Sequence, residues 1–154
     1  MNKNKGFTLI EVIIYIALFS LLLGTAFVTA FQLIDGSNQL STKNTTQEEG
    51  NFVLRKLNWA LIGVNPGASV TPSSGTGDEL EVTKYDGTTI NVTLNGTAIE
   101  MDEGGGSLPI TTENVSVDDL TFTHIDAVGT GPAGITATAT IDGKEFTITK
   151  YFRK

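Results

Sequence analysis

The chain has 154 residues, no cysteine and a formal net charge of −7. This length suits one globular domain plus a membrane segment, and the lack of cysteine excludes disulfides and thiol-based metal or nucleophile chemistry. The acidic balance gives little electrostatic support to nucleic acid binding, so we expect no nucleic acid partner.

The N-terminus combines a short basic segment with a long apolar run. Lys3 and Lys5 precede residues 7–34, in which Glu11 is the one charged residue. The run exceeds the roughly 20 residues that span a bilayer, and it is much longer than the apolar core of a secretory signal peptide. Because basic residues favour the cytoplasmic side, we predict a membrane-spanning helix at 7–34 with a cytoplasmic N-terminus and the rest of the chain outside.

Glu11 is the unusual residue of this predicted span. An acidic side chain near the centre of a membrane helix costs about 2.5–3.5 kcal/mol, and less near the interface. Two interpretations stay open from the residues alone. Glu11 extends to the membrane surface in a plain signal anchor, or it pairs with a charged group of another chain.

The residues Gly6-Phe7-Thr8-Leu9-Ile10-Glu11, with the basic leader before them and the apolar run after them, resemble the signal of type IV prepilins and pseudopilins. The resemblance covers about the first fifth of the chain. It implies that a prepilin peptidase cuts between Gly6 and Phe7 and methylates the new N-terminus. It also implies that Glu11 pairs with the Phe7 ammonium of a neighbouring subunit and so sets the register between subunits. Such a pair offsets the cost of two isolated charges in a low dielectric.

Residues 35–64 are predicted to continue the helix out of the membrane. Asp35-Gly36-Ser37-Asn38 is typical of a turn, so we expect the helix to loosen near Gly36. Asn65-Pro66-Gly67 is expected to end it, because proline disfavours helical geometry in the preceding residue. Trp59 could pack under a loop or face a neighbour, and core packing is the favoured prediction. One apolar face follows helical spacing and should pack on a sheet: Val53, Leu57, Ala60, Leu61 and Val64.

Residues 65–154 have the composition of short strands joined by tight turns. Residues 66–78 are rich in Pro, Gly and Ser and are predicted to be a linker. Asp86-Gly87 and Asp142-Gly143 separate alternating segments and predict two hairpins. The whole is predicted to be an α+β roll, with an antiparallel meander against the second half of the helix. The expected strands are 79–85, 88–94, 97–101, 114–123, 135–141 and 145–152.

A second, looser resemblance concerns the end of the chain. Residues 113–123, followed by a last hairpin that ends at Arg153, are similar in pattern to the minor pilins and pseudopilins of the broad J/W type. This resemblance favours a minor subunit over a major one.

Catalytic and metal-binding patterns are not found in the sequence. His124 is the one histidine, and we expect it on a strand surface or edge. Asp118-Asp119 and Asp102-Glu103 offer oxygen ligands of the kind that Ca²⁺ prefers, but neighbouring strand residues point to opposite faces, so we expect solvated pairs. We predict no enzyme activity, no cofactor and no metal.

The sequence therefore predicts a structural subunit, a minor pilin or pseudopilin of a type IV pilus-like or type II secretion filament. Its parts would be a cleaved leader (1–6), a filament-core helix (7–34), the helix continuation (35–64) and an extracytoplasmic head (65–154). The partners implied by the resemblance are prepilin peptidase, other pilin or pseudopilin subunits, and the membrane assembly platform. The protein would span the membrane once before assembly and then lie in an extracellular or periplasmic filament. The alternative is a signal-anchored surface domain that binds a ligand and does not polymerise.

Overall fold

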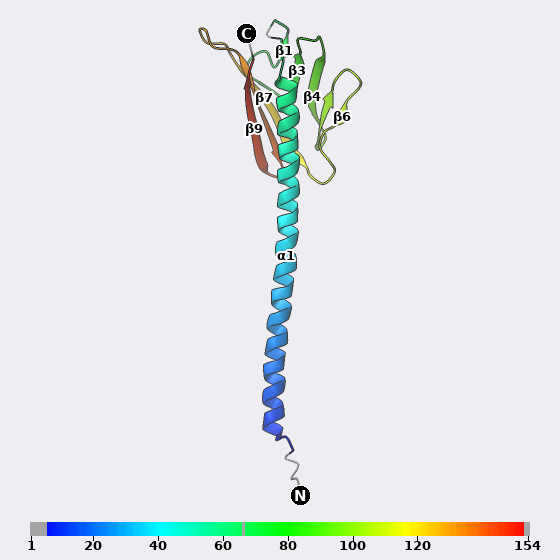
Figure 1. The fold of residues 1–154 in the computed structure, drawn as a ribbon, viewed down its shortest axis with the longest axis vertical. Coiled ribbons are helices and arrows are strands. Elements are labelled where there is room, and N and C mark those ends of the chain that lie inside the picture. Colours follow the sequence, from blue (N-terminus) through cyan, green and yellow to red (C-terminus); the bar gives the residue numbers. More distant parts are fainter. Residues whose placement is uncertain (1–5, 66, 153–154) are drawn as a thin grey trace. The chain divides into compact units, whose positions relative to one another are not determined.

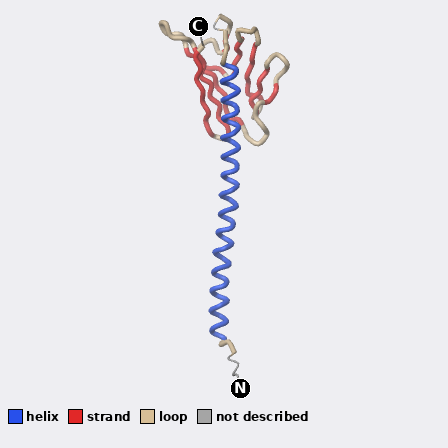
Figure 2. Tube along the Cα trace, viewed as in Figure 1, coloured by secondary structure: helices blue, strands red, loops and turns tan. Residues whose placement is uncertain are grey.

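A computed structural model describes residues 6–65 and 67–152 of the chain. It divides into two compact units, Met1–Thr42 and Lys43–Lys154. The helix α1, Leu9–Leu61, begins in the first unit and ends in the second (Figures 1 and 2). The predictions for Lys3, Lys5, Pro66 and Arg153 lie outside the described residues.

The first unit contains the N-terminal part of α1. Its large side chains between Phe7 and Ile34 are exposed, and an 18-residue window of α1 reaches a mean hydropathy of 2.4. By length and composition this helix is suited to cross a membrane. The helix runs through Gly36 without a break, so the loosening expected there is not found. A single glycine costs a helix only about 1 kcal/mol relative to alanine, which explains why it is tolerated.

The end of α1 differs from the prediction. The helix ends at Leu61, three residues before the expected Val64. Gly63 has a φ of 74°, the left-handed conformation that commonly terminates helices. Gly63 therefore ends the helix. The sequence had predicted that Asn65-Pro66-Gly67 would end it.

The second unit places the last turns of α1 against two antiparallel sheets. One sheet has the strand order β1-β3-β4-β5-β6, and the other has the order β2-β7-β8-β9 (Figure 1). The α+β class is confirmed, although the single predicted meander is two sheets. The strands are β1 Val70–Thr71, β2 Thr76–Gly77, β3 Glu79–Thr83, β4 Thr89–Asn95, β5 Ala98–Asp102, β6 Leu108–Pro109, β7 Val117–Ile125, β8 Gly134–Ile141 and β9 Lys144–Tyr151.

Both predicted hairpins are present. The β8–β9 hairpin turns at Asp142 and Gly143, whose φ angles of 49° and 72° fit a two-residue turn of the primed type. The β3–β4 turn is longer than two residues, because the last strand pair is Thr83 with Thr89. The predicted linker at 66–78 contains β1, which pairs with the nearby strand β3, and β2, which pairs with β7 far along the chain.

The core lies between α1 and the sheets. Val53, Leu57 and Ala60 are fully buried, as their helical spacing predicts. The helix approaches β9 closely at Gly50, where a Cβ atom would lie 2.2 Å from the Phe146 ring. Trp59 is 41% exposed, so its predicted core role is wrong. It lies one position before buried Ala60 and therefore points away from the core.

Candidate processing and assembly site

The start of α1 is fixed by Thr8. The backbone N–H of Glu11 donates to Thr8 Oγ1 at 3.3 Å, and the N–H of Val12 donates to the Thr8 carbonyl at 3.3 Å. Thr8 is thus the N-cap, and the helix begins at Leu9, where the sequence analysis had Phe7. The pattern Thr-x-x-Glu is a known start signal, and it could have located this boundary.

Gly6 and Phe7 precede the cap and are exposed in non-helical backbone. A peptide bond in a regular helix is held by hydrogen bonds on both sides, whereas a bond before the N-cap is free of them. Glycine also presents no side chain to an approaching protein. The Gly6–Phe7 bond therefore lies in exposed, non-helical backbone.

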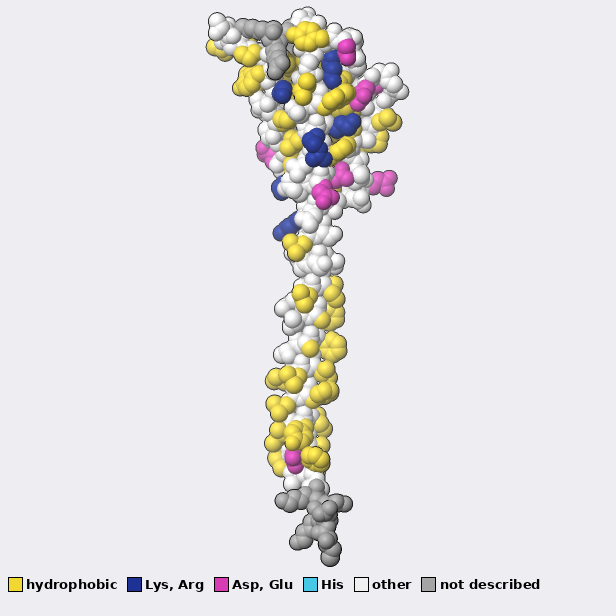
Figure 3. Space-filling view, viewed as in Figure 1, with side chains coloured by type: hydrophobic (Ala, Val, Ile, Leu, Met, Phe, Trp, Pro, Cys, Tyr) yellow, Lys and Arg dark blue, Asp and Glu magenta, His cyan; other side chains and the backbone are white. Residues whose placement is uncertain are grey.

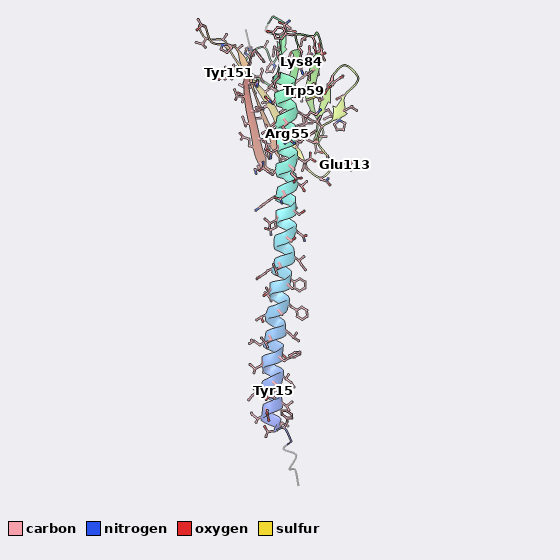
Figure 4. The ribbon with its side chains drawn as sticks, in the orientation of Figure 1. Tyr15, Arg55, Trp59, Lys84, Glu113 and Tyr151 are labelled. Atoms are coloured by element: carbon pink, nitrogen blue, oxygen red, sulfur yellow. The ribbon has the colours of Figure 1, made fainter. Side chains whose placement is uncertain are left out.

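The Glu11 carboxylate has a partner on its own helix. The Tyr15 hydroxyl donates a hydrogen bond to Glu11 Oε1 over 3.1 Å, from one helical turn further along. The Tyr15 ring also meets the Phe7 ring edge-on, with centroids 6.2 Å apart and planes at 76°. Phe7, Glu11 and Tyr15 therefore form one contiguous group at the start of the chain's apolar helix (Tyr15 is labelled in Figure 4). The sequence analysis missed Tyr15, although its i+4 spacing from Glu11 is a usable signal.

The electrostatics of Glu11 are incompletely balanced within its unit. A carboxylate in the first turn interacts favourably with the positive end of the helix dipole. Between residues 6 and 42, however, the sequence has no Lys or Arg that could neutralise it. Within residues 6–42, Glu11 therefore has no cationic side chain with which to pair.

The rest of the first unit is an apolar surface. Large side chains on all sides of the helix are between 43% and 80% exposed, and hydrophobic atoms cover this region in Figure 3. A soluble monomer rarely exposes so much contiguous apolar surface. This part of the helix is therefore suited to lipid or to other apolar helices. Examples are Leu9, Ile16, Phe19, Leu22, Phe27 and Phe31.

The other polar candidates have structural roles in the second unit. Asp118 accepts a hydrogen bond from the Gly143 N–H at 2.7 Å, and Asp119 accepts one from the Thr121 hydroxyl at 3.1 Å. Asp102 accepts the N–H groups of its own loop at Gly104 and Gly106. No group of three or more His, Asp or Glu suited to a metal occurs among residues 6–65 and 67–152.

His124 lies on β7 and is less accessible than expected. Its side chain is 13% exposed, and Nδ1 lies 3.1 Å from Asp126 Oδ1. Its backbone N–H donates to the Gly75 carbonyl at 2.7 Å, next to the short strand β2. Because β7 lies between β2 and β8, the expected surface or edge position of His124 is not found.

Residues 1–27 match the family described as the prokaryotic N-terminal methylation motif. No curated protein and no solved structure matches the chain. The chain is thus an α+β protein that carries this motif at its N-terminus, followed by a helix that fits a single-pass membrane anchor. The motif is the type IV pilin and pseudopilin signal, and it indicates a type IV pilin-like substrate of prepilin peptidase.

Proposed function

We propose that the protein is a minor pilin or pseudopilin, a structural subunit of a type IV pilus-like or type II secretion filament. The observation that carries the proposal is the start of α1. An accessible Gly6–Phe7 bond stands directly before a long exposed apolar helix whose first turn holds one carboxylate, Glu11. A plain membrane anchor needs the apolar helix but has no use for the other two features.

Processing is proposed at the Gly6–Phe7 bond. Hydrolysis of this peptide bond leaves a carboxylate on Gly6 and an amine on Phe7, and it removes Lys3 and Lys5 with the leader. Once Lys3 and Lys5 are removed, the new ammonium is the one cation of residues 7–42. Methylation of this amine keeps its positive charge while making it less hydrated, which lowers the cost of burying it.

Glu11 is proposed to set the register between subunits. In a bundle of parallel helices, its carboxylate would pair with the Phe7 ammonium of a neighbour. Two charges that are each costly in an apolar bundle are then satisfied together, and only in one axial position. The Tyr15 hydroxyl binds Glu11 Oε1, so the other carboxylate oxygen is left for the ammonium and the hydrogen bond can be kept in the filament.

The parts of the chain follow from this proposal. Residues 1–6 are the leader, 7–34 the filament-core helix, 35–64 its continuation onto the sheets, and 65–154 the head. The subunit spans the membrane once, meets prepilin peptidase and the assembly platform there, and then enters the filament outside the membrane.

A second candidate function rests on the outer face of the sheet β2-β7-β8-β9. Threonine hydroxyls from neighbouring strands pair across it, Thr136 with Thr149 at 2.9 Å and Thr138 with Thr147 at 3.2 Å. Such a hydroxyl-rich face could serve a signal-anchored binding domain that does not polymerise. Only the filament proposal requires the chain to assemble.

The test compares filament recovery for the wild type, Glu11→Ala and Glu11→Asp. In cells with an active prepilin peptidase, wild-type protein is expected in the sheared extracellular or periplasmic fraction. Glu11→Ala should stay in the membrane, while Glu11→Asp keeps the charge and should assemble in part. Wild-type protein that is processed but never leaves the membrane would favour the anchored binding domain.

A further inference from the structure

Strand β9 is the one long free edge of the two sheets in the part of the chain that the structure describes. The two strand orders leave β1, β2, β6 and β9 at the edges. The first three have two residues each, whereas β9 has eight. β9 pairs with β8 alone, and Figure 1 shows it on the outside of the sheet, beside α1. A long edge strand presents a row of unpaired backbone groups to which another strand can add.

The residues of β9 that offer these groups follow from its pairing. The backbone N–H of Phe152 donates to the Ala133 carbonyl at 2.8 Å, and the register continues from there along β8. Because hydrogen-bonded pairs alternate with non-bonded pairs in an antiparallel ladder, the even-numbered residues of β9 bond to β8. The odd-numbered residues direct their N–H and C=O groups outward, and these groups have no backbone partner within residues 6–65 and 67–152. They are Glu145, Thr147, Thr149 and Tyr151.

A groove follows the same edge on the side of α1. One hollow of about 360 Å³ lies beside Ile148, and another of about 420 Å³ lies beside Lys150. These two residues are about 6.7 Å apart along the strand, which is also the spacing of alternate side chains in a strand added to β9. Every second side chain of an added strand would therefore enter a hollow. The wall that α1 contributes consists of Asn51, Leu54, Arg55, Asn58 and Ile62.

The charges along this edge are mainly positive. Lys144 begins β9, Lys150 lies near its end, and Arg55 lies on the α1 wall, as labelled in Figure 4. None of these three cations forms an ion pair with another described residue, and Glu145 is the one carboxylate of the strand. In a chain of net charge −7, the edge is a local reversal of sign. Charge complementarity therefore favours an acidic partner.

We propose that β9 binds an extended, acidic segment of another protein, which adds to the sheet β2-β7-β8-β9 as a fifth strand. Its backbone bonds to the outward groups of Thr147 and Thr149. Every second side chain enters the groove, where its carboxylate lies near Arg55 or Lys150 and its stem packs on Ile148. In this mode of recognition the backbone bonds give affinity and the hollows give specificity. The inference goes beyond the proposed function, since it requires only the head and not assembly.

A second copy of the chain fits this edge less well. Two copies anchored in one membrane would run in the same direction, so their β9 strands would meet in parallel. In register, Lys144 would then face Lys144 and Lys150 would face Lys150, and like charges directly opposite each other are destabilising. The other free edges in the described residues are two residues long and offer no strand of matching length.

Binding of synthetic peptides to the full-length chain in detergent tests the proposal. The probe is a fluorescent eight-residue peptide in which glutamate alternates with threonine. Lysine in place of glutamate should weaken binding at least about tenfold. Two further peptides carry N-methyl groups on every glutamate or on every threonine, and each loses the hydrogen-bond donors of one edge. One of the two should lose at least about tenfold in affinity and the other should not. Equal binding of the two, or no binding of the acidic peptide, would overturn the proposal.

A matched pair of variants tests the strand edge of the protein. Thr147→Pro removes an outward N–H at a position where an edge strand tolerates proline, so peptide affinity should fall at least about tenfold. Thr147→Val keeps the N–H and should bind like the wild type. Unfolding followed by Trp59 fluorescence shows whether the head of each variant is intact. If Thr147→Pro unfolds, Thr149→Pro makes the same change further along, and the methylated peptides decide without any variant.

A second pair tests the charge of the groove. Arg55→Glu should weaken binding of the glutamate peptide about tenfold and strengthen binding of the lysine peptide, since the sign of the α1 wall changes. Lys56→Glu makes the same kind of change at the next residue, which lines a different hollow with Met101 and Leu108, and it should have little effect. Equal effects of the two variants would mean that the groove does not select the peptide, and the proposal would fail.

The outcomes separate this inference from the proposed function. If the wild type assembles but the acidic peptide does not bind, the filament function stands and the inference fails. If the peptide binds to β9 and the chain never assembles, the inference stands and the filament function fails. If the wild type binds no peptide and Thr147→Pro lowers filament recovery, the edge belongs to a second copy of the chain and the inference is overturned.

Discussion

The two units use one helix in opposite ways. In the first unit every large side chain of α1 is exposed, whereas in the second Val53, Leu57 and Ala60 are fully buried against the sheets. The described part of the first unit has no buried apolar core, so its stability depends on a membrane or on other helices. The second has its own core. A change in α1 should therefore affect head stability or assembly, according to the unit in which it lies.

The largest effect on stability is expected at Leu57. Leu57→Ala removes a fully buried side chain and should lower the free energy of unfolding of the second unit by about 2–5 kcal/mol. Leu22→Ala makes the same change where the side chain is 65% exposed, and head unfolding should not respond. The fluorescence of Trp59, the one tryptophan, reports the transition in detergent. Equal destabilisation by both variants would contradict the division into two units.

A matched glycine pair sharpens the same comparison. Gly50→Ala places a Cβ atom where the Phe146 ring lies, so it should destabilise the head by about 1–3 kcal/mol. Gly36→Ala meets no atom within 4 Å and should leave the head unchanged, while it favours the helix by up to about 1 kcal/mol. Chemical denaturation of the two variants measures the difference. A Gly50→Ala head as stable as the wild type would show that β9 does not need this close approach.

Within the first unit, Tyr15→Phe should have a moderate effect. The substitution keeps the ring that meets Phe7 and removes the hydroxyl that binds Glu11. Because a hydrogen bond of this kind contributes about 0.5–1.5 kcal/mol, filament recovery should fall by about two- to tenfold. Head stability should not change. If Tyr15→Leu lowers recovery while Tyr15→Phe does not, the ring contact is what matters and the hydrogen bond is not.

The smallest effect is expected at the β3–β4 turn. The backbone N–H of Thr88 donates to Asp86 Oδ1 at 2.9 Å and holds the pKa of this carboxyl below its ordinary value. A lowered pKa in the folded state means that the stabilisation is complete above the unfolded pKa of about 3.9 and is lost as the pH falls through the folded value. An NMR titration should show Asp86 titrating below an unstructured aspartate. Asp86→Asn should lessen the loss of head stability at acid pH. If the variant loses stability with falling pH as steeply as the wild type, the Asp86 carboxylate does not contribute to this loss.

The sequence predicted those features that depend on local pattern. The core face at Val53, Leu57 and Ala60 follows helical spacing, and the Asp142-Gly143 turn follows from its residues alone. Strands β1, β2 and β6 were not predicted, because two residues carry no period. For β2 the pairing partner is also distant in the chain, as in Thr76 with Thr123. The split into two sheets depends on the same long-range pairing.

The same distinction applies to the functional residues. Gly6, Phe7 and Glu11 lie close together in the sequence, and they were selected from it as candidate site residues. Their roles in processing and in setting the register stay predictions. Thr8 and Tyr15 act through hydrogen bonds to Glu11 that become evident once the helix start is located. A core position was favoured for Trp59, yet it lies at the surface, where Lys56 and Lys84 lie over its ring.

The most direct test of the central claim is the intact mass of the membrane-extracted protein, with mapping of its N-terminal peptide. In cells with an active prepilin peptidase, the chain is predicted to begin at Phe7 and to be one methyl group heavier than that sequence. Gly6→Leu, which adds a bulky side chain at the cut, should leave the chain starting at Met1. A wild-type chain that still starts at Met1 in those cells would contradict the account and leave an anchored surface domain.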